Sequence, residues 1–258
     1  MASFPFTSAL VTGASSGIGE AAARRLLAGG VPTVVVARRR DRLDAIASEH
    51  DRAEVLVADL VTAEGQAAVA DRIADRERPV DLVVNNAGFG TNGTFHELDP
   101  GRLGDEVELN VAAVTRLSHA ALAAMVPRGR GWLLNVSSVA SFQPAPELAV
   151  YAATKAYVTS LTESLHEEVR GTGVHVTALC PGLTRTEFQR VSNTSRYADE
   201  FPSIAWTSPD DVVDTGLADV IANRAISVPG YQYKAMVAAT NVTPRWLRRW
   251  ASSLVQRH

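Results

Sequence analysis

A glycine-rich stretch near the amino terminus most constrains how this chain can fold. Residues 9–11 form a short apolar run that stops at Thr12, glycines follow at positions 13, 17 and 19, and a run rich in Ala, Leu and Arg continues to residue 28. This order predicts a strand, a glycine turn and a helix. We expect Gly13 to permit the sharp turn, Gly17 to let a ligand approach the backbone, and Gly19 to let the helix pack closely on the strand.

The turn also carries hydroxyl donors, because Ser15 and Ser16 lie between the glycines. Together with the unpaired N–H groups and positive dipole end of the following helix, they would suit a pyrophosphate. The glycine spacing is G-x-x-x-G-x-G, whereas the general dinucleotide fingerprint is G-x-G-x-x-G. From this stretch alone, a plain glycine-rich loop remains an open alternative.

Apolar runs alternate with amphipathic runs along the rest of the chain. Strands are predicted at 33–37, 54–58, 81–84, 131–136, 174–179 and 225–228, and helices near 40–50, 63–76, 101–126, 149–170 and 209–223. Continuous apolar strands that alternate with helices indicate a parallel sheet covered on both faces. The predicted fold is therefore α/β, a doubly wound (Rossmann) parallel sheet of about seven strands, in a single domain.

Composition excludes several other classes. The 258 residues are 46% hydrophobic and carry a net charge of −3, which does not suit nucleic-acid binding. The single cysteine, Cys180, excludes an internal disulfide, and the six histidines have no ligand spacing, so we predict no metal. The opening residues do not resemble a signal peptide and no run of 18 apolar residues occurs, so we expect a soluble cytoplasmic protein.

In such a sheet, ligands lie across the carboxyl ends of the strands. Arg38-Arg39-Arg40 follow the second strand, where an acid would bind the adenosine ribose and an arginine would instead pair with a 2′-phosphate. We therefore predict NADP(H) in preference to NAD(H), with Arg38 as the first phosphate ligand and Arg39 as the second. The alternative is a solvated basic helix start, partly neutralised by Asp41 and Asp44.

Two further strand ends carry candidate ligands. Asp59-Leu60 follow the third strand, where Asp59 could accept a hydrogen bond from an adenine amino group, although Asp59 or Thr62 could equally cap a helix. Asn86-Ala87-Gly88 follow the fourth strand. Asn110 falls inside a predicted helix, where asparagine is a weak helix former, and its simplest interpretation is a residue that faces solvent.

The fifth strand ends in Ser137-Ser138, and Tyr151 and Lys155 lie one turn apart at the start of the next helix. Both side chains can therefore point at the strand end. A phenol is a poor base at neutral pH, but two unit charges about 5 Å apart at an effective dielectric constant of about 20 interact by roughly 3 kcal/mol, which would lower the phenol pKa by about two units. Tyr151 would then exchange a proton with an alcohol or carbonyl.

These motifs, in this order, resemble those of the short-chain dehydrogenase/reductase family over about residues 5 to 190. The resemblance rests on Thr12-Gly13-Ala14-Ser15-Ser16-Gly17-Ile18-Gly19, Asn85-Asn86-Ala87-Gly88, the serine-ended strand and Tyr151-x-x-x-Lys155. It implies that Ser138, rather than Ser137, orients the substrate oxygen, that Lys155 also binds the nicotinamide ribose, and that Asn110 opens its helix and holds a water on a proton path. It further implies that Asn86-Ala87-Gly88 line the cofactor.

The same resemblance extends to Cys180-Pro181-Gly182-Leu183-Thr184-Arg185-Thr186. In the family this segment lies beside the nicotinamide, so Pro181, Gly182, Thr186 and Thr184 are implied to hold the ring carboxamide. A simple Pro-Gly turn is the alternative. The implied chemistry is hydride transfer between the nicotinamide and a carbonyl or alcohol carbon, with Tyr151 as the acid/base.

Two carboxyl-terminal segments are less defined. Residues 187–207 carry aromatic and aliphatic side chains, including Tyr197, without clear periodicity, and suggest a mobile apolar lid over a hydrophobic carbonyl substrate. Residues 231–258 carry five Lys/Arg and no acid, and Thr243-Pro244 could start a basic amphipathic helix containing Trp246, Leu247, Trp250 and Leu254. We expect this extension to pack on its own domain or on a partner subunit; a membrane surface or an anionic acyl carrier is a less favoured contact.

The predicted function is an NADP(H)-dependent oxidoreductase that acts on a small carbonyl or alcohol as a homodimer or homotetramer, with a core domain over residues 1–230. A non-catalytic NADP-sensing regulator is the alternative, because it would share the glycine loop but would not need Ser138, Tyr151 and Lys155 together. A nucleotide-sugar epimerase or dehydratase would usually have different glycine spacing and a larger carboxyl-terminal domain.

Overall fold

The computed structural model describes residues 4–195 and 201–244 and contains one seven-stranded sheet. Every pairing between neighbouring strands is parallel, and the strand order is β3-β2-β1-β4-β5-β6-β7. The strands are β1 (Ala9–Thr12), β2 (Thr33–Ala37), β3 (Ala53–Val57), β4 (Leu82–Asn85), β5 (Gly131–Val136), β6 (Val174–Leu179) and β7 (Ile226–Ser227). The order reverses between β1 and β4, so a crevice opens there at the carboxyl ends of the strands.

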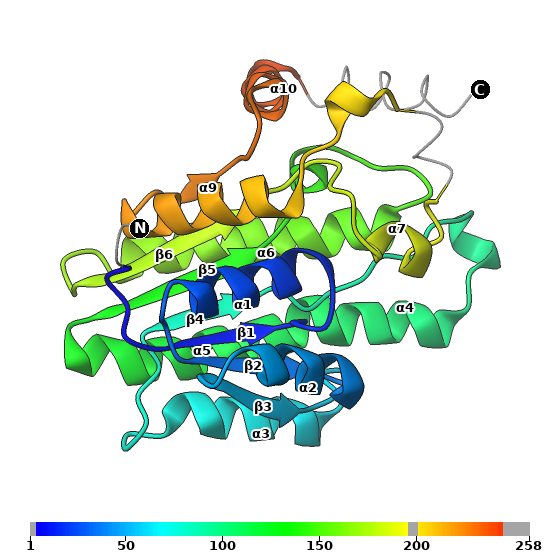
Figure 1. The fold of residues 1–258 in the computed structure, drawn as a ribbon. Helices are drawn as coiled ribbons and strands as arrows, with labels where there is room; N and C mark the ends of the chain where they lie inside the picture. Colours follow the sequence, from blue (N-terminus) through cyan, green and yellow to red (C-terminus); the bar gives the residue numbers. More distant parts are fainter. Residues whose placement is uncertain (1–3, 196–200, 245–258) are drawn as a thin grey trace.

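Helices cover both faces of the sheet (Figure 1). They are α1 (Gly17–Ala28), α2 (Arg40–Glu49), α3 (Ala63–Ala74), α4 (Pro100–Val107), α5 (Val114–Met125), α6 (Ala149–Glu168), α7 (Phe188–Val191), α9 (Pro209–Ile221) and α10 (Tyr231–Val242). Buried side chains of α1, α2 and α9 form one core cluster with the sheet, and those of α3 and α5 form a second cluster on the opposite face. The doubly wound α/β prediction is confirmed, and the predicted strands and helices agree with the structure to within one or two residues at most boundaries.

The predicted helix near 101–126 is interrupted in the structure. It consists of α4, a π-helical segment η2 (Glu108–Ala113) and α5, so the hydrogen-bond pattern loosens by one residue around Asn110. Within the described residues, the stretch Pro100–Arg128 is long and apolar enough to cross a membrane by length and composition, with a mean hydropathy of 1.3. Because Leu117 and Met125 are fully buried in the second core cluster, we interpret it as a core helix.

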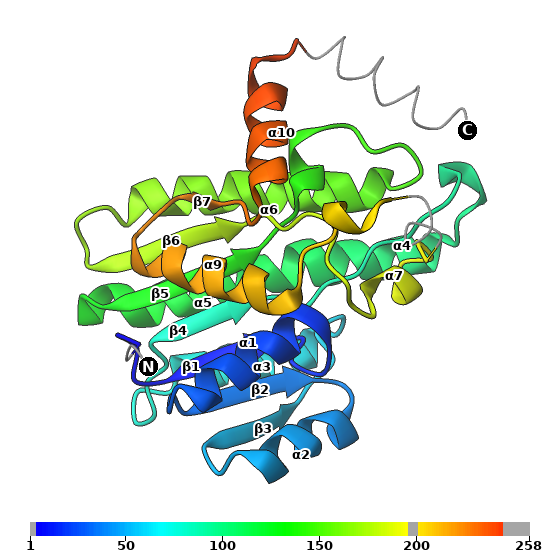
Figure 2. The ribbon, with the colours of Figure 1, turned by 45° about the horizontal axis from the view of Figure 1, so that its top comes forward.

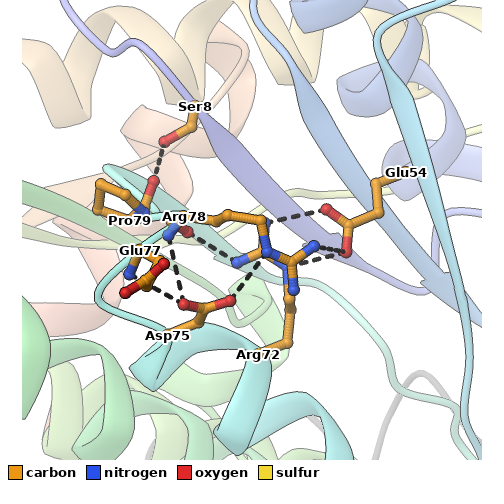
Figure 3. Close-up of polar contacts among 7 residues, drawn as sticks. All are labelled: Ser8, Glu54, Arg72, Asp75, Glu77, Arg78 and Pro79. Atoms are coloured by element: carbon orange, nitrogen blue, oxygen red, sulfur yellow. Dashed lines mark hydrogen bonds and ion pairs between the residues drawn. The ribbon is translucent and has the colours of Figure 1, made fainter.

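Charged side chains hold the edge strand β3 to the helix that covers it (Figure 3). Arg72 of α3 binds both carboxylate oxygens of Glu54, at 2.9 and 3.0 Å, and Arg78 adds a contact of 3.3 Å to the same group. Arg78 is itself held by Asp75 at 2.9 Å. The hydrogen bond from Arg72 lowers the pKa of Glu54. A charged, bidentate pair on an edge strand fixes the strand and opposes pairing with another chain.

The carboxyl-terminal helix α10 was not predicted from the sequence. Figure 2 shows it projecting beyond the sheet near the end of β7. Its first half is nevertheless packed, because Tyr233 and Val237 are buried against Ala178, Cys180 and Val228. The start of the predicted basic extension therefore packs on the sheet domain, whereas the amphipathic helix expected after Thr243-Pro244, with Trp246, Leu247, Trp250 and Leu254, lies outside the described residues, as does Tyr197.

Candidate active site

A cavity of about 760 Å³ lies at the carboxyl ends of the strands. It is lined by nearly all of the residues that the sequence singled out: Gly13, Ser15, Ser16, Gly17, Ile18, Arg38, Arg39, Asp59, Leu60, Asn86, Ala87, Gly88, Ser138, Tyr151, Lys155, Pro181, Gly182, Thr184 and Thr186. Gly19 and Asn110 do not line it and lie behind its wall. One cavity therefore contains both the glycine loop and the Ser-Tyr-Lys cluster.

The glycine loop exposes bare backbone to the cavity at positions where a side chain would not fit. Gly13 and Gly17 have φ values of 69° and 58°, a conformation that other residues rarely adopt. A Cβ at Gly17 would lie 2.9 Å from the Thr186 side chain, and α1 begins at Gly17 with its unpaired N–H groups facing the loop. A bare backbone beside a helix N-terminus fits the pyrophosphate of a dinucleotide.

Gly19 carries a packing role that gives a testable prediction. A Cβ there would lie 2.3 Å from both Gly13 O and Asn86 Nδ2, so Gly19→Ala should force the helix from the strand and destabilise the protein by roughly 1–3 kcal/mol. Thermal unfolding measures this. Gly104→Ala in α4 is the matched control, because a Cβ there would meet nothing within 4 Å. Equal melting temperatures for Gly19→Ala and the wild type would contradict the packing argument.

Thr12 and the asparagines of β4 join the central strands, a role that the sequence did not reveal for Thr12. The Thr12 hydroxyl accepts hydrogen bonds of 3.0 Å from the N–H groups of Asn86 and Ala87, and Asn86 Nδ2 donates to Thr12 O at 2.9 Å. Asn85 Nδ2 donates to Asn135 Oδ1 at 2.9 Å. The bonds of Thr12 join β1 to the end of β4, where the strand order reverses, and the Asn85 bond joins β4 to β5.

The two arginines after β2 differ in their surroundings. Arg38, whose side chain is 70% exposed, has a loose ion pair of 3.7 Å with Asp59. Arg39 crosses the glycine loop, where it donates to Ser15 Oγ at 3.0 Å and to Glu187 at 2.9 Å. Glu187 belongs to the predicted lid, and the hydrogen bond from Arg39 lowers its pKa. The segment that begins at Glu187 is thus tied to the glycine loop by an ion pair that no sequence pattern indicated.

Asp59 lies on the cavity wall and also orders the backbone that follows it. Its carboxylate accepts a hydrogen bond of 3.1 Å from Val61 N. The helix cap is Thr62, whose hydroxyl accepts from Gly65 N at 3.1 Å. Of the two capping alternatives, Thr62 is therefore the observed one.

The two serines after β5 have separate environments. The Ser137 hydroxyl is buried, donates to Lys155 O at 2.8 Å and lies 2.7 Å from Thr159 Oγ1. The Ser138 hydroxyl accepts from Ala140 N at 3.1 Å, which starts a 3₁₀ turn, and it also interacts with the phenol of Tyr151. Ser138 is consequently the serine whose hydroxyl reaches Tyr151.

Tyr151 and Lys155 do not behave as the simple charge argument predicted. Lys155 Nζ lies 5.8 Å from the centre of the Tyr151 ring and donates to Val136 O at 2.8 Å. Burial raises the pKa of Tyr151 to about 12 and lowers the pKa of Lys155 to about 8. The expected lowering of the phenol pKa is therefore wrong for the protein alone, because desolvation of both groups outweighs their attraction. Tyr151 rests as a phenol, the form that donates a proton.

Asn110 faces the protein interior, so its interpretation as a solvent-facing residue is wrong. It lies in the π-helical segment and is completely buried. Its Nδ2 donates to Phe89 O at 2.8 Å and to Thr154 Oγ1 at 3.1 Å, and its Oδ1 accepts from Phe89 N at 3.2 Å. Asn110 therefore joins the loop after β4 to the helix that carries Tyr151 and Lys155.

The segment after β6 closes one side of the cavity. Thr186 Oγ1 accepts from Phe188 N at 3.1 Å and Thr184 Oγ1 donates to Gly182 O at 3.0 Å. Leu183 N donates to the Tyr233 hydroxyl at 2.9 Å, and α10 lines the cavity through Gln232, Tyr233 and Met236. These contacts of α10 were not predicted, because the sequence analysis placed the helix start later, at Thr243-Pro244.

The segment predicted to form a lid is anchored by residues that sequence reasoning missed. Ser192 is fully buried, and its hydroxyl accepts from Gly90 N at 2.9 Å. Arg102 donates to Val191 O at 2.6 Å and stacks over the Phe89 ring. A polar serine in an irregular segment carries no signal of burial, so only the fold reveals this anchor.

The sheet, the glycine loop and the cavity together define a Rossmann-type dinucleotide-binding protein with a Ser-Tyr-Lys cluster beside its cofactor crevice. A family model described as short chain dehydrogenase matches residues 7–196. The chain therefore belongs to the short-chain dehydrogenase family and is an oxidoreductase that uses a nicotinamide cofactor.

Three relatives illustrate this membership. The gluconate 5-dehydrogenase of Gluconobacter oxydans is 34% identical over 231 residues, which cover 85% of this chain and 88% of that protein. A short-chain dehydrogenase from Sphingobium yanoikuyae in complex with NADPH has a TM-score of 0.82 and 32% identity, covering 91% and 93% of the two chains. The bulky-bulky ketone specific alcohol dehydrogenase from Comamonas testosteroni has a TM-score of 0.77 and 30% identity, covering 91% and 92%.

Proposed function

We propose that this protein interconverts an apolar ketone or aldehyde and the corresponding alcohol with NADP(H). The observation that carries the proposal is that Ser138, Tyr151 and Lys155 line the same cavity as the glycine loop. When bound, the cofactor supplies or accepts the hydride at its nicotinamide ring. A regulator that only senses the cofactor would not need these three side chains together, so the enzyme is the favoured interpretation.

Each side chain has a role that its surroundings support. The Ser138 hydroxyl would hold the substrate oxygen, and Tyr151, which interacts with Ser138, would donate a proton to that oxygen during reduction. Lys155 would supply positive charge and reach the nicotinamide ribose. Asn110, which is fixed between the Phe89 backbone and Thr154 on α6, would hold a water that supplies the replacement proton.

The substrate side of the cavity favours an apolar compound. Phe89, Leu148, Phe188, Val191 and Met236 line it. The relative from Comamonas testosteroni is described as specific for bulky-bulky ketones, which agrees with this apolar lining. We further propose that the protein is cytoplasmic and forms a homodimer or homotetramer.

Incubation with NADPH and a panel of ketones, followed by nicotinamide absorbance, tests the function: oxidation of NADPH with apolar ketones supports it, and no turnover with any ketone or aldehyde contradicts it.

The preference for NADP(H) is proposed to depend mainly on Arg38. Its loose contact with Asp59 leaves the guanidinium available for a 2′-phosphate, whereas Arg39 is held by Ser15 and Glu187. Hydrogen bonds to charged groups contribute about 1.5–3 kcal/mol, so Arg38→Ala should weaken NADPH binding by roughly 10- to 100-fold. NADH binding should change by less than about threefold, because NADH lacks the phosphate.

Fluorescence titration with both cofactors measures this preference. Arg40→Ala is the matched control, because Arg40 is exposed and has only a 4.0 Å contact with Asp44. Equal losses of NADPH and NADH affinity in Arg38→Ala would mean that the arginines form only a solvated helix start.

A further inference from the structure

Glu106 is a buried carboxyl group that the proposed mechanism does not use. It lies in α4 with 0% of its surface exposed, and neither carboxylate oxygen has a full hydrogen bond among the described residues. Thr91 is the polar residue against it: weak interactions from its hydroxyl and its N–H favour the carboxylate, but the hydroxyl makes no full hydrogen bond among the described residues. Burial raises the pKa of Glu106 above its usual value. An unsatisfied buried carboxyl is costly, so its position requires an explanation.

The helix geometry directs Glu106 toward the catalytic pair. Glu106 lies four residues before Asn110, on the same face, and Asn110 bonds Thr154 of α6. Both α4 and α6 follow strands of the parallel sheet, so the two helices run in the same direction. Because Asn110 contacts Thr154, we infer that the residues one turn earlier on each helix, Glu106 and Tyr151, lie at the same level. The charge of Glu106 acts on Tyr151 and on Lys155, whose pKa values it raises.

We propose that Glu106 is a positioning residue that acts through its charge, keeping Tyr151 and Lys155 protonated together and so favouring carbonyl reduction at physiological pH. The predicted effect of Glu106 on ketone reduction rests on the proposed function. The predicted effect of Glu106 on the protonation of Tyr151 and Lys155 does not depend on any substrate.

The direction of the effect follows from the total charge of the pair. With Tyr151 as a phenol and Lys155 as an ammonium, the pair has one positive charge, and it has none after losing one proton, whichever residue loses it. A nearby carboxylate stabilises the charged form. Removing the carboxylate must therefore lower the first macroscopic pKa of the pair.

Other groups around Glu106 do not cancel this effect. Arg102, one turn earlier on α4, directs its guanidinium to Val191 O and the Phe89 ring. Cys180, directly after β6, acts on Tyr151 and Lys155, but burial raises the pKa of its thiol to about 12, so the thiol is neutral below that pH. From the loop after β4, Thr91 carries no charge.

The pH profile of kcat/KM for ketone reduction by NADPH tests the proposal. In Glu106→Gln, the alkaline limb should move to lower pH by about one unit, because reduction needs the protonated pair. Glu106→Asp, which keeps the charge, should restore the wild-type limb. Asp105→Asn is the matched control. Asp105 is the exposed residue next to Glu106 on α4, and removing its negative charge should leave the alkaline limb of the pH profile unchanged.

A second measurement does not depend on turnover. Tyrosine labelled with carbon-13 at the hydroxyl-bearing ring carbon reports the titration of Tyr151 by NMR, with Tyr151→Phe identifying the signal. Its first midpoint should fall by about one pH unit in Glu106→Gln and in Glu106→Met, an uncharged variant that needs no hydrogen bonds. This result can hold even if no ketone is a substrate, so it separates failure of the inference from failure of the proposed function.

Two outcomes would overturn the inference. One is a wild-type midpoint in both uncharged variants. The other is an equal shift in Glu106→Asp and Glu106→Gln, which would assign Glu106 a purely structural role.

Discussion

Replacement of Tyr151 by phenylalanine is expected to reduce ketone turnover by about 10²- to 10⁴-fold, the usual contribution of a positioned proton donor. The change removes one oxygen atom from a buried ring that packs on Phe188 at 5.3 Å between ring centres. The cavity and the glycine loop should therefore remain intact, and the dissociation constant of NADPH should change by less than about threefold. Steady-state kinetics and fluorescence titration measure the two quantities.

A matched control for this variant exists on the same helix. Tyr157 lies on α6 with its hydroxyl 2.9 Å from Thr115 Oγ1 on α5, and Tyr157 is absent from the cavity lining. Tyr157→Phe should keep wild-type turnover. Wild-type turnover in Tyr151→Phe would refute the assignment of Tyr151 as the proton donor.

Replacement of Lys155 by methionine is expected to abolish reduction while it stabilises the fold at neutral pH. Lys155 is only 4% exposed, and burial lowers its pKa from 10.5 to about 8. Below pH 8 the folded protein therefore carries a buried charge that costs roughly 3 kcal/mol. Methionine removes this cost but also removes the 2.8 Å bond to Val136 O, worth about 1 kcal/mol.

The remaining gain of roughly 1–2 kcal/mol should raise the melting temperature by roughly 2–6 °C at pH 7. Because the folded-state pKa of Lys155 is lowered, the cost is fully present below about pH 8 and disappears as the pH rises through 10.5. The advantage of Lys155→Met should therefore shrink between pH 8 and 10.5. Thermal unfolding across this range measures it. A constant difference, or a variant less stable than the wild type at pH 7, would contradict the assigned cost of burial.

The fold was predictable because its signals are local. Each buried parallel strand is a continuous apolar run, and several helices begin at a capping side chain, as at Thr62 and Ser208. The glycine loop and the Tyr151-Lys155 pair were visible for the same reason, since their chemistry depends on residues close together in sequence.

Features that depend on distant contacts were not predictable. The ion pair of Arg39 with Glu187 joins residues 148 positions apart, and the Ser192 anchor joins residues 102 positions apart. The helix α10 has no regular apolar stripe, and its role in the cavity depends on where β7 ends. The predicted direction of the Tyr151 pKa shift was wrong, because a sequence shows which charged residues are neighbours but not how deeply they are buried.

The most direct test of the central claim is hydride transfer itself. NADPH deuterated at C4 of the nicotinamide would be incubated with an apolar ketone from the panel, and the alcohol product would be analysed by mass spectrometry. One deuterium on the carbinol carbon is expected with the wild type, and almost no product with Tyr151→Phe. Alcohol without deuterium from both C4-labelled stereoisomers, or equal product from the two proteins, would contradict hydride transfer with Tyr151 as the proton donor.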